Sequence, residues 1–471
     1  MSRSSIVVAI AVLVALSPGT PRAEICSIDP VPGATLLLPY FEVDIGDAEG
    51  LGVNTVFTVS NAGPAPTIAH ITLWTDWSYG TVDFDIFLAG YDTVTVDLFQ
   101  VIGNGNLPVT ADEQNDPADT ISPNGGNPDW DGSFSFCADI FPFPQPVITG
   151  GLLDRVQNGH SGYPVPSLND DCAGEGLNGA GVCSSGSCPS GTIARGFVTV
   201  DSANDCSLVF PFDADYFVDG GTGTASNTNN LWGEFLFLES GVTTAGGPLV
   251  AVEADDDFSA VSTPTGYTFY GRFTQGTGGV DNREPLGTTW TAQFKGSGNT
   301  ATEFVVWRDP TAGGNPNSGW DCGLSSSGAG PDWAPLSETE VVCVDHDSNV
   351  AETLCSGEVG GSACFPLATQ KVAVGAGSLN PSFASGWCYL NLNLDDSFPA
   401  DVDFPPPAGA VAQSYIFSVY SVDSQIEAAT AGTVLFDGCQ NFVPVFGSVE
   451  ESVFLNGFES GDTSGWSSTR Q

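Results

Sequence analysis

The segment NTVFTVSNAGPAP, residues 54–66, is the clearest indication of how this chain folds. In an extended backbone, Phe57 and Val59 fall on one face, while Val56 and Thr58 fall on the other. The alternation then stops at an Asn-Ala-Gly-Pro sequence. Alternation with a period of two that ends in Asn, Gly and Pro is typical of a strand closed by a turn.

The same pattern recurs before and after this segment. Residues 34–44 and 67–77 read as strands, and residues 81–102 read as two strands around a Gly-Tyr-Asp turn. Helical periodicity is almost absent, and the best helix candidate is Leu152–Gln157. A second strand-rich region begins near Gly246, and YTFYGRF at 267–273 reads as one of its strands. Many short strands at this spacing predict an all-β protein with two immunoglobulin-like β-sandwich domains.

Composition shifts divide the chain further. The expected order is a signal peptide at 1–23, a first sandwich at 24–245, a second sandwich at 246–447 and a tail at 448–471. A Cys- and Gly-rich loop at 162–191 interrupts the first sandwich, and a Gly- and Pro-rich insert at 311–335 interrupts the second. We expect long surface loops stapled by disulfides at these places.

The N-terminus predicts export. Arg3 precedes the apolar run Ile6–Leu16, and Ala23 offers a small residue for cleavage. This run is too short to span a bilayer, so it reads as a secretory signal peptide, and no later stretch is long and apolar enough to span one. An extracytoplasmic location, secreted or at the cell surface, favours disulfides over metal thiolates. The disulfide candidates are Cys26, Cys137, Cys172, Cys183, Cys188, Cys206, Cys322, Cys343, Cys355, Cys364, Cys388 and Cys439.

Charge narrows the possible partners. The chain has 56 acidic and 10 basic residues, with a net charge of −46, and its lysines are Lys295 and Lys371. Such a surface repels nucleic acid and anionic lipid because no basic stripe can gather phosphates. It favours divalent cations, although acidity also serves solubility alone.

Several phrases of strand and turn carry a resemblance. They are LLLPYFEVD, NTVFTVSNAG, HITLWTDW, GFVTVDSANDCS, NNLWGEFLFL, YTFYGRF, DNREPLGTTW and EFVVWRDP. Together they resemble an uncharacterised family of exported bacterial β-rich proteins. The resemblance implies an extracytoplasmic protein of a Gram-negative bacterium. It implies no catalytic residue, cofactor or ligand.

Catalytic motifs are scarce. No G-x-S-x-G elbow, H-E-x-x-H motif or phosphate-binding glycine loop is present. His70, His160 and His346 lie in separate segments, and a structural role is expected for each. A glycosidase needs only a carboxylate pair, which an acidic chain supplies by chance. We therefore predict no enzyme and no catalytic residue, with a secreted carbohydrate-active enzyme as the alternative.

Calcium is the best-supported ligand among the ions. The segment VDHDSNVAE places oxygen ligands at alternate positions, as a loop around a hard cation requires. The candidate ligands are Asp345, Asp347, Asn349 and Glu352. The loop departs from an EF-hand because it lacks the turn glycine and the last glutamate. A disulfide between the flanking Cys343 and Cys355 would close and stiffen it. The alternative is a solvated acidic strand.

Aromatic residues suggest a second kind of site. Trp74 and Trp77 in LWTDW, with Tyr79 beside them, offer a platform on which a sugar can stack. Alternation places the two tryptophans on opposite faces of a strand, so one of them is expected in the core.

The last residues, FLNGFESGDTSGWSSTRQ at 454–471, form a separate segment. They resemble an F-x-x-G-F-E-x-G-D-x-S-x-W-S phrase at the ends of other exported bacterial proteins. Too little chain follows Trp466 to complete a domain, and no apolar span is present. A receptor-read address and a strand docked on the last sandwich both remain open.

The sequence therefore predicts an exported, non-catalytic structural or binding protein, with calcium as a candidate stabiliser. Its expected partner is a surface protein or a glycan.

Overall fold

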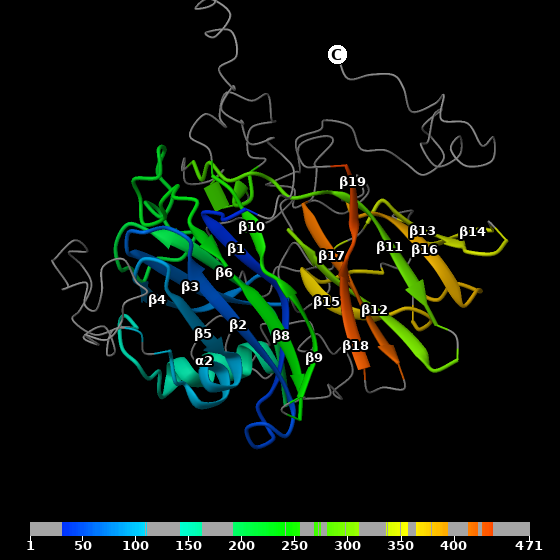
Figure 1. Cartoon of the computed structure of the whole chain (residues 1–471), viewed down its shortest axis with the longest axis horizontal. Helices are drawn as coiled ribbons and strands as arrows, with labels where there is room; N and C mark the ends of the chain where they lie inside the picture. The colour runs from blue at the N-terminus through cyan, green and yellow to red at the C-terminus, as the bar shows by residue number, and fades with distance from the viewer. Residues whose placement is uncertain are drawn as a thin grey trace, which may run out of the picture.

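The computed structural model, drawn in Figure 1, is mostly β. It describes residues 31–108, 110, 142–162, 192–240, 242–254, 268–271, 273–274, 280–296, 298–309, 336, 338–348, 350–356, 364–377, 379–393, 413–422 and 426–436. In these ranges the strands form four antiparallel sheets, and two short helices accompany them. The predicted all-β class is thus confirmed.

Two sheets make up the first half of the structure, which is blue to green in Figure 1. Sheet 1 has the strand order β10 (Val250–Val252), β1 (Thr35–Asp44), β6 (Ile193–Ala203), β3 (Thr67–Thr75) and β4 (Gly80–Leu88). Sheet 2 has the order β5 (Thr93–Asp97), β2 (Val53–Asn61), β8 (Glu234–Glu239) and β9 (Val242–Pro248), with β7 (Leu231–Trp232) also paired to β2. As expected, Phe57 and Val59 of β2 are buried, whereas Val56 and Thr58 are half-buried.

Two further sheets make up the second half, which is yellow-green to orange in Figure 1. Sheet 3 has the order β15 (Thr369–Ala373), β12 (Thr300–Arg308), β17 (Ser414–Val422) and β18 (Ile426–Ala431). Sheet 4 has the order β14 (Ala351–Ser356), β13 (Glu340–Asp345), β16 (Ser385–Asn391), β11 (Thr289–Lys295) and β19 (Thr433–Phe436). Aromatic and aliphatic residues between sheets 3 and 4, Trp290 and Phe304 among them, form the second core.

The two helices are short and lie in the first half. The π-helix η1 covers Phe99–Asn104, and α2 covers Gly151–Ser161. The predicted helix at 152–157 is thus confirmed. The helix α2 packs against β4 and β6 and ends at Gly162, whose φ of 85° is the left-handed conformation that glycine adopts at helix ends.

Sheet 1 is buried on both faces. In β3, Ala69, Ile71 and Leu73 point into an aliphatic core shared with sheet 2. The alternate residues point to the opposite face, where an aromatic cluster includes Trp74 and Phe197. Because water is excluded from both sides, polar residues on the second face must find partners inside the protein. That second face carries the candidate site.

One predicted strand is a turn in the structure. Thr268, Phe269 and Tyr270 lie in a tight bend, where the Gly271 N–H donates to the Thr268 carbonyl over 3.0 Å. The Phe273 N–H likewise donates to the Tyr270 carbonyl over 2.8 Å. Because the backbone bonds to itself here, Phe269, Tyr270 and Phe273 project from a compact turn.

The first half extends beyond residue 245. Strand β9 at Val242–Pro248 pairs with β8, and β10 at Val250–Val252 pairs with β1, so both belong to sheets of the first half. The second half begins its pairing with β11 at Thr289–Lys295. The expected boundary at 245/246 falls inside one strand, and the division of the chain into two domains stays a prediction.

Two disulfides are defined within the described residues. Cys343 on β13 pairs with Cys388 on the neighbouring strand β16, with Cα atoms 4.0 Å apart. Cys355 pairs with Cys364, with Cα atoms 5.9 Å apart. Cys206 is disulfide-bonded as well. The expected disulfide between Cys343 and Cys355 is therefore wrong, because each of these cysteines has another partner.

Several predicted features lie outside the described residues. They are the signal peptide at 1–23, nearly all of the loop at 162–191, the insert at 311–335, the tail at 448–471, Asn349, and Cys26, Cys137, Cys172, Cys183, Cys188, Cys322 and Cys439.

Candidate functional site

The face of sheet 1 that points away from sheet 2, called the outer face below, carries polar and aromatic side chains at paired positions of neighbouring strands. Strand β3 presents His70, Thr72 and Trp74 on this face, and each pairs with a residue on β6. The partners are, in the same order, Asp201, Thr199 and Phe197. All six side chains are buried. The face therefore has a charged end around His70 and Asp201 and an aromatic end around Trp74 and Phe197.

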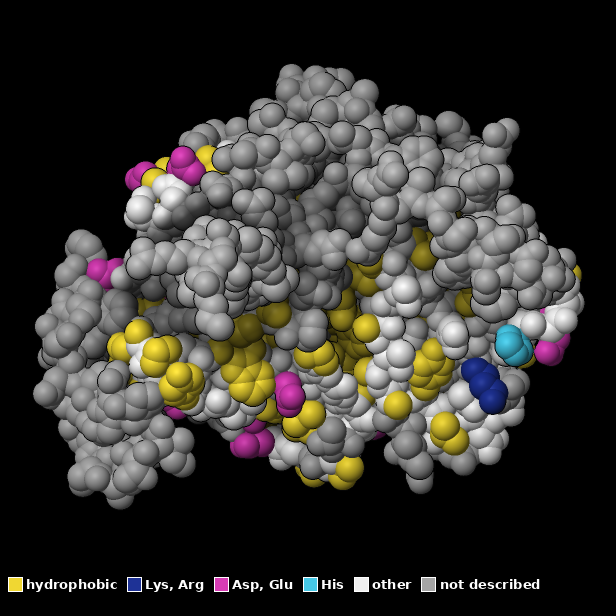
Figure 2. Space-filling view, turned by 45° about the horizontal axis from the view of Figure 1, so that its top comes forward, with side chains coloured by type: hydrophobic (Ala, Val, Ile, Leu, Met, Phe, Trp, Pro, Cys, Tyr) yellow, Lys and Arg dark blue, Asp and Glu magenta, His cyan; other side chains and the backbone are white. Residues whose placement is uncertain are grey.

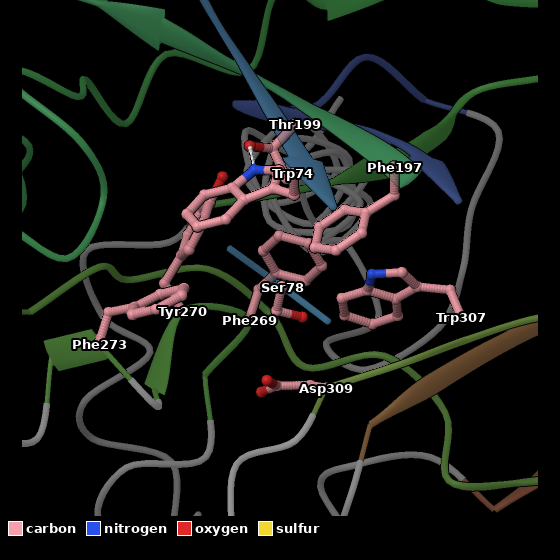
Figure 3. A pocket seen from close by; sticks show the side chains of 9 residues that line it. All are labelled: Trp74, Ser78, Phe197, Thr199, Phe269, Tyr270, Phe273, Trp307 and Asp309. Carbon is pink, nitrogen blue, oxygen red and sulfur yellow. Dashed lines mark hydrogen bonds between the residues drawn. The ribbon is translucent and has the colours of Figure 1, made fainter. Parts of the chain in front are cut away.

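The aromatic end contains a small cavity, called the aromatic pocket below and shown in Figure 3. Its volume is about 20 Å³. Strands β3, β6 and β12 contribute to its lining, as do the turn after β3 and the turn at 268–274. The lining residues are Trp74, Ser78, Phe197, Thr199, Phe269, Tyr270, Phe273, Trp307 and Asp309.

The rings of the pocket hold one another in place. The Trp74 ring stacks on Phe197, with centroids 5.8 Å apart and planes 6° apart, and on Phe273 at 5.4 Å and 20°. Trp307 stacks on Phe269 at 5.5 Å and meets the Phe197 ring edge-on at 5.9 Å. Stacked and edge-on contacts of this kind are the favoured aromatic arrangements. The pocket walls are therefore well ordered before any ligand arrives.

The polar atoms that line the pocket differ in whether they have a hydrogen-bond partner. The Trp74 Nε1–H donates to Thr199 Oγ1 over 2.9 Å. The Trp307 Nε1–H finds no hydrogen-bond partner among the described residues, although the side chain is only 4% exposed. Asp309, at the end of β12, adds a carboxylate that is 5% exposed. An unpaired buried donor is costly, so the indole N–H of Trp307 favours a guest that can accept its hydrogen bond.

The turn after β3 places Ser78 at the pocket. The Thr75 N–H donates to the Tyr79 carbonyl over 2.9 Å, and the Ser78 N–H donates to the Thr75 carbonyl over 2.9 Å. Ser78 has a φ of 63°, which is a left-handed conformation that side chains other than glycine rarely adopt. Strain of this kind is concentrated at functional sites, where the surrounding structure enforces it.

A buried polar network fills the charged end of the face, and Asp201 is its centre. The Tyr216 and Tyr270 hydroxyls donate to Asp201 Oδ2 over 2.7 and 2.9 Å, and the Thr35 hydroxyl donates to Oδ1. The Arg283 Nη2 atom lies 3.7 Å from the same Oδ1. Burial, and then the Asp201 carboxylate, raises the pKa of both tyrosines well above the ordinary value. Both hydroxyls therefore remain protonated donors.

Arg283 connects this network to the backbone. Its Nη1–H donates to the Asp281 carbonyl over 2.7 Å, and its Nη2–H donates to the Ser226 carbonyl over 2.8 Å. Its Nε–H donates to Thr35 Oγ1 over 2.8 Å, and its guanidinium lies 5.0 Å from the Phe217 ring centroid. A buried guanidinium with this many partners acts as a cross-link between loop and sheet.

His70 lies between two carboxylates at the edge of the same network. Its Nδ1 is 2.8 Å from Asp85 Oδ1, and its Nε2 is 3.8 Å from Asp83 Oδ2. Burial by itself lowers the pKa of His70, but the Asp85 carboxylate more than offsets this and the pKa is raised to about 9. Burial raises the pKa of Asp83 to about 6. His70 is thus a charged group held inside the protein by Asp85.

The polar network around Asp201 is suited to a structural role, whereas the aromatic pocket is suited to ligand binding. The groups around Asp201 are buried and bonded to one another, so they hold the outer face of sheet 1 together. The adjoining pocket combines apolar walls, an available N–H donor and a carboxylate. A pocket that is mostly apolar with a few placed polar groups is typical of ligand sites.

Of the predicted calcium ligands that the structure describes, Asp345, Asp347 and Glu352 do not form a group with metal-ligand spacing. Asp345 accepts hydrogen bonds from the Ser348 hydroxyl, which lowers the pKa of its carboxyl, and from the Asp347 N–H. Glu352 accepts one from the Ser382 N–H over 2.8 Å. Among the described residues, the one group with metal-ligand spacing is Glu338, Cys355 and Cys364. The two cysteines of that group are joined in a disulfide, so their sulfurs are not thiolates.

The histidines lie apart, as expected. His160 is buried on α2, where its Nδ1–H donates to the Arg195 carbonyl over 2.9 Å and its Nε2 lies 2.8 Å from Thr81 Oγ1. His346 is exposed in a turn after β13.

The tryptophans differ from the expected platform. Trp74 and Trp77 are 1% and 4% exposed, so neither presents a ring on the surface.

Sequence reasoning missed Trp307, Asp309, Asp201 and Arg283. A signal was present for Arg308, which is one of only ten basic residues and follows the apolar and aromatic phrase FVVW, whereas Arg283 stands in the polar phrase DNREP. Such a cation is expected to be buried and paired.

No helix in the described part of the chain is long and apolar enough to cross a membrane. Comparison with family models, curated proteins and solved structures finds no match to this chain.

Proposed function

We propose that this chain is an exported, non-catalytic binding protein that takes its ligand at the aromatic pocket. The observation that carries the proposal is the buried Trp307 Nε1–H, which has no partner among the described residues and lines a cavity beside the Asp309 carboxylate. In the adjoining polar network, Asp201 and Arg283 are bonded to groups of the protein itself, which favours a structural role for them over a catalytic one.

The phrases that carry the family resemblance support this placement. HITLWTDW contributes Trp74, GFVTVD contributes Phe197 and Thr199, and EFVVWRDP contributes Trp307 and Asp309. YTFYGRF adds further rings to the same lining, and DNREPLGTTW supplies Arg283 of the adjoining network around Asp201. Segments far apart in the chain thus meet at one place. We propose that the resemblance reflects this shared site.

The finer architecture and the location belong to the same proposal. We infer immunoglobulin-like sandwiches with disulfide-stapled loops, and a cleaved signal peptide that delivers the chain outside the cytoplasm. The paired cysteines of the described residues suit an oxidising compartment.

Calcium stabilisation at Asp345, Asp347, Asn349 and Glu352 stays a separate proposal. If an ion binds there, the melting temperature rises in millimolar calcium and falls in EDTA. An identical midpoint in both solutions contradicts calcium binding, while leaving the aromatic pocket unaffected.

The pocket is tested by ligand binding to the full mature chain. A panel of neutral sugars, uronates, amines and amino acids is titrated by calorimetry. We expect a ligand whose binding is lost in Trp307→Phe and in Asp309→Asn. The matched control is Trp232→Phe, because Trp232 lies on β7 of sheet 2, is 44% exposed and does not line the pocket.

Two outcomes contradict the proposal. One is binding that is equal in all three variants, and the other is the absence of any ligand from the panel. Turnover of a polysaccharide that disappears on replacing one carboxylate favours a carbohydrate-active enzyme instead.

A further inference from the structure

We propose that the charged end of the outer face holds one internal water molecule, bound between His70, Thr72 and Asp83. This site is separate from the aromatic pocket, so the inference goes beyond the proposed function. The positions of the three side chains, their unused hydrogen-bonding atoms and their charges each support it.

The three side chains converge because of the register of two strands. Thr72 on β3 pairs directly with Asp83 on β4, and His70 pairs with Asp85. Directly paired residues of an antiparallel sheet have Cβ atoms about 4.5–5.5 Å apart, and residues two positions apart on a strand point to the same face. His70, Thr72 and Asp83 therefore meet on the outer face of sheet 1.

Each of the three side chains has a buried polar atom with no hydrogen-bond partner among the described residues. These atoms are His70 Nε2, Thr72 Oγ1 and Asp83 Oδ2. The side chains of His70 and Thr72 are fully buried, and Asp83 is 9% exposed. A buried polar group that stays unpaired lowers stability, so three such atoms at one place favour a common partner that bonds to all of them.

The distance between His70 and Asp83 suits a bridging molecule. Nε2 and Oδ2 are 3.8 Å apart, which is too long for a direct hydrogen bond. Across more than about 3.5 Å, two polar atoms connect through an intervening molecule such as water. The imidazole is held in place, because its Nδ1 lies 2.8 Å from Asp85 Oδ1 while Asp85 Oδ2 accepts from the Ser207 N–H over 2.8 Å.

The donors and acceptors of the site select water as the bridging molecule. Burial by itself lowers the pKa of His70, but the Asp85 carboxylate raises it to about 9, so Nε2 carries a hydrogen and is a donor at neutral pH. Asp83 Oδ2 is an acceptor, and the Thr72 hydroxyl can take either role. Water accepts from His70, donates to Asp83 and bonds to Thr72 as well. Buried waters typically make about three hydrogen bonds, as this one does.

Charge disfavours the other small guests. A cation is repelled by the charged His70 and finds no lone pair on its ring, and an anion is repelled by Asp83. The other charged groups that act on the site are Asp85, Asp201 and Arg155. The net charge of −46 adds to the repulsion of anions, and on the face shown in Figure 2 Lys and Arg appear only near the right edge. A neutral molecule is therefore favoured.

The first test is the sign of the stability change in Thr72→Val, a variant that keeps the shape of the side chain and removes the hydroxyl. If the hydroxyl bonds to a buried water, its loss deprives that water of a partner, and we expect the equilibrium constant for unfolding in urea to rise about fivefold. If the hydroxyl is buried without a partner, its removal is neutral or stabilising. An equilibrium constant that is unchanged or lower therefore overturns the proposal.

Two control variants accompany this measurement. Thr72→Ser keeps the hydroxyl and should retain the bound water. Thr95→Val makes the same change at an exposed position of β5, where we expect the equilibrium constant to change by about twofold or less. A rise in Thr95→Val as large as that in Thr72→Val shows that the loss of the hydroxyl acts without the water.

A crystal structure of the full mature chain, grown after treatment with EDTA, tests the site directly. We expect one peak of electron density within about 3.2 Å of His70 Nε2, Thr72 Oγ1 and Asp83 Oδ2, retained in Thr72→Ser and weakened in Thr72→Val. A direct hydrogen bond between His70 and Asp83 with no peak beside it contradicts the proposal. A peak that appears only when EDTA is omitted identifies a cation and contradicts it too.

Discussion

Two buried arginines stand out in a chain with so few cations. Arg283 bonds to loop carbonyls beneath sheet 1, as described above. Arg308 donates to the Phe365 and Leu392 carbonyls over 2.8 and 2.7 Å, and it lies 3.5 Å from a Glu338 oxygen. Each of these two guanidinium groups donates to backbone carbonyls that are not paired within a sheet, so each cross-links segments of its own half of the structure.

Replacing Arg283 by methionine should be strongly destabilising. The change leaves Asp201 without its cation and two carbonyls without donors, so we expect a loss of about 3–5 kcal/mol in the free energy of unfolding. Urea unfolding measures the loss. The control is Lys295→Met, which removes the same charge from an exposed position and should cost about 0.5 kcal/mol or less. Similar losses for the two variants contradict the cross-link.

His160 should make the protein sensitive to acid. Burial lowers the pKa of His160 to about 4, whereas an unfolded histidine titrates near its usual 6.5. Between pH 6.5 and 4, His160 is protonated in the unfolded chain but stays neutral in the folded protein. The free energy of unfolding therefore falls as the pH drops from 6.5 to 4, by on the order of 3 kcal/mol in total.

The test compares the unaltered chain with His160→Gln, whose amide can still bond to Thr81 and to the Arg195 carbonyl. Urea unfolding at several pH values should show the difference between the two proteins shrinking as the pH falls through this window. A constant difference shows that His160 does not titrate as described.

Among the elements, the strands of sheet 4 are joined by covalent bonds as well as hydrogen bonds. Cys343 faces Cys388 directly across the β13–β16 pair, and Cys355 at the β14 edge is tied to Cys364 beyond it. This side of the sheet, from β14 to β16, thus has two disulfides with different loop lengths, 45 and 9 residues.

Removing the two disulfides should have unequal effects. In the chain-entropy description, closing a 45-residue loop contributes about 4 kcal/mol and closing a 9-residue loop about 3 kcal/mol. We therefore expect Cys343→Ala with Cys388→Ala to lower the melting temperature more than Cys355→Ala with Cys364→Ala. The comparison is made by calorimetry on both double variants. The opposite order rules out loop length as the cause.

For the molecule as a whole, the two halves share a core. Phe417 on β17 of sheet 3 packs against Phe235 and Phe237 on β8 of sheet 2, with ring centroids 5.7 and 6.2 Å apart. Val305 on β12 belongs to the same cluster. The aromatic pocket also takes side chains from both halves, since Trp74 lies on β3 and Trp307 on β12. Contact between the halves is thus part of how the site is built.

Phe417→Ala should destabilise both halves of the structure. Truncating a buried phenylalanine lowers the free energy of unfolding by about 3–5 kcal/mol. In this variant the truncation leaves a new cavity at the contact between sheets 2 and 3. Hydrogen exchange should speed up at amides of β8 as well as β12. The control is Phe294→Ala, because Phe294 is buried in the core of sheets 3 and 4 and should affect those sheets alone. Unchanged exchange in β8 contradicts a shared core.

Local sequence predicted the elements better than the site. Alternation identified β2, β3 and β4 because the period of two reflects which face of a strand is buried. It failed at residues 268–274, where aromatic residues look like strand but the backbone forms a turn. It also placed one of Trp74 and Trp77 in the core and the other on the opposite face, and it could not show that both are buried, because alternation does not reveal that a sheet is covered on both faces.

The sequence by itself determined that this protein is built of strands, that cysteines are available to cross-link it and that its surface is acidic. These properties depend on residues close together in the chain or on composition alone. Only the tertiary structure decided that Trp74, Phe197, Trp307 and Asp309 line one cavity, that Arg283 lies beside Asp201, and that Cys343 pairs with Cys388. Such contacts join residues up to more than two hundred positions apart, and they follow from how sheets pack, which no local pattern encodes.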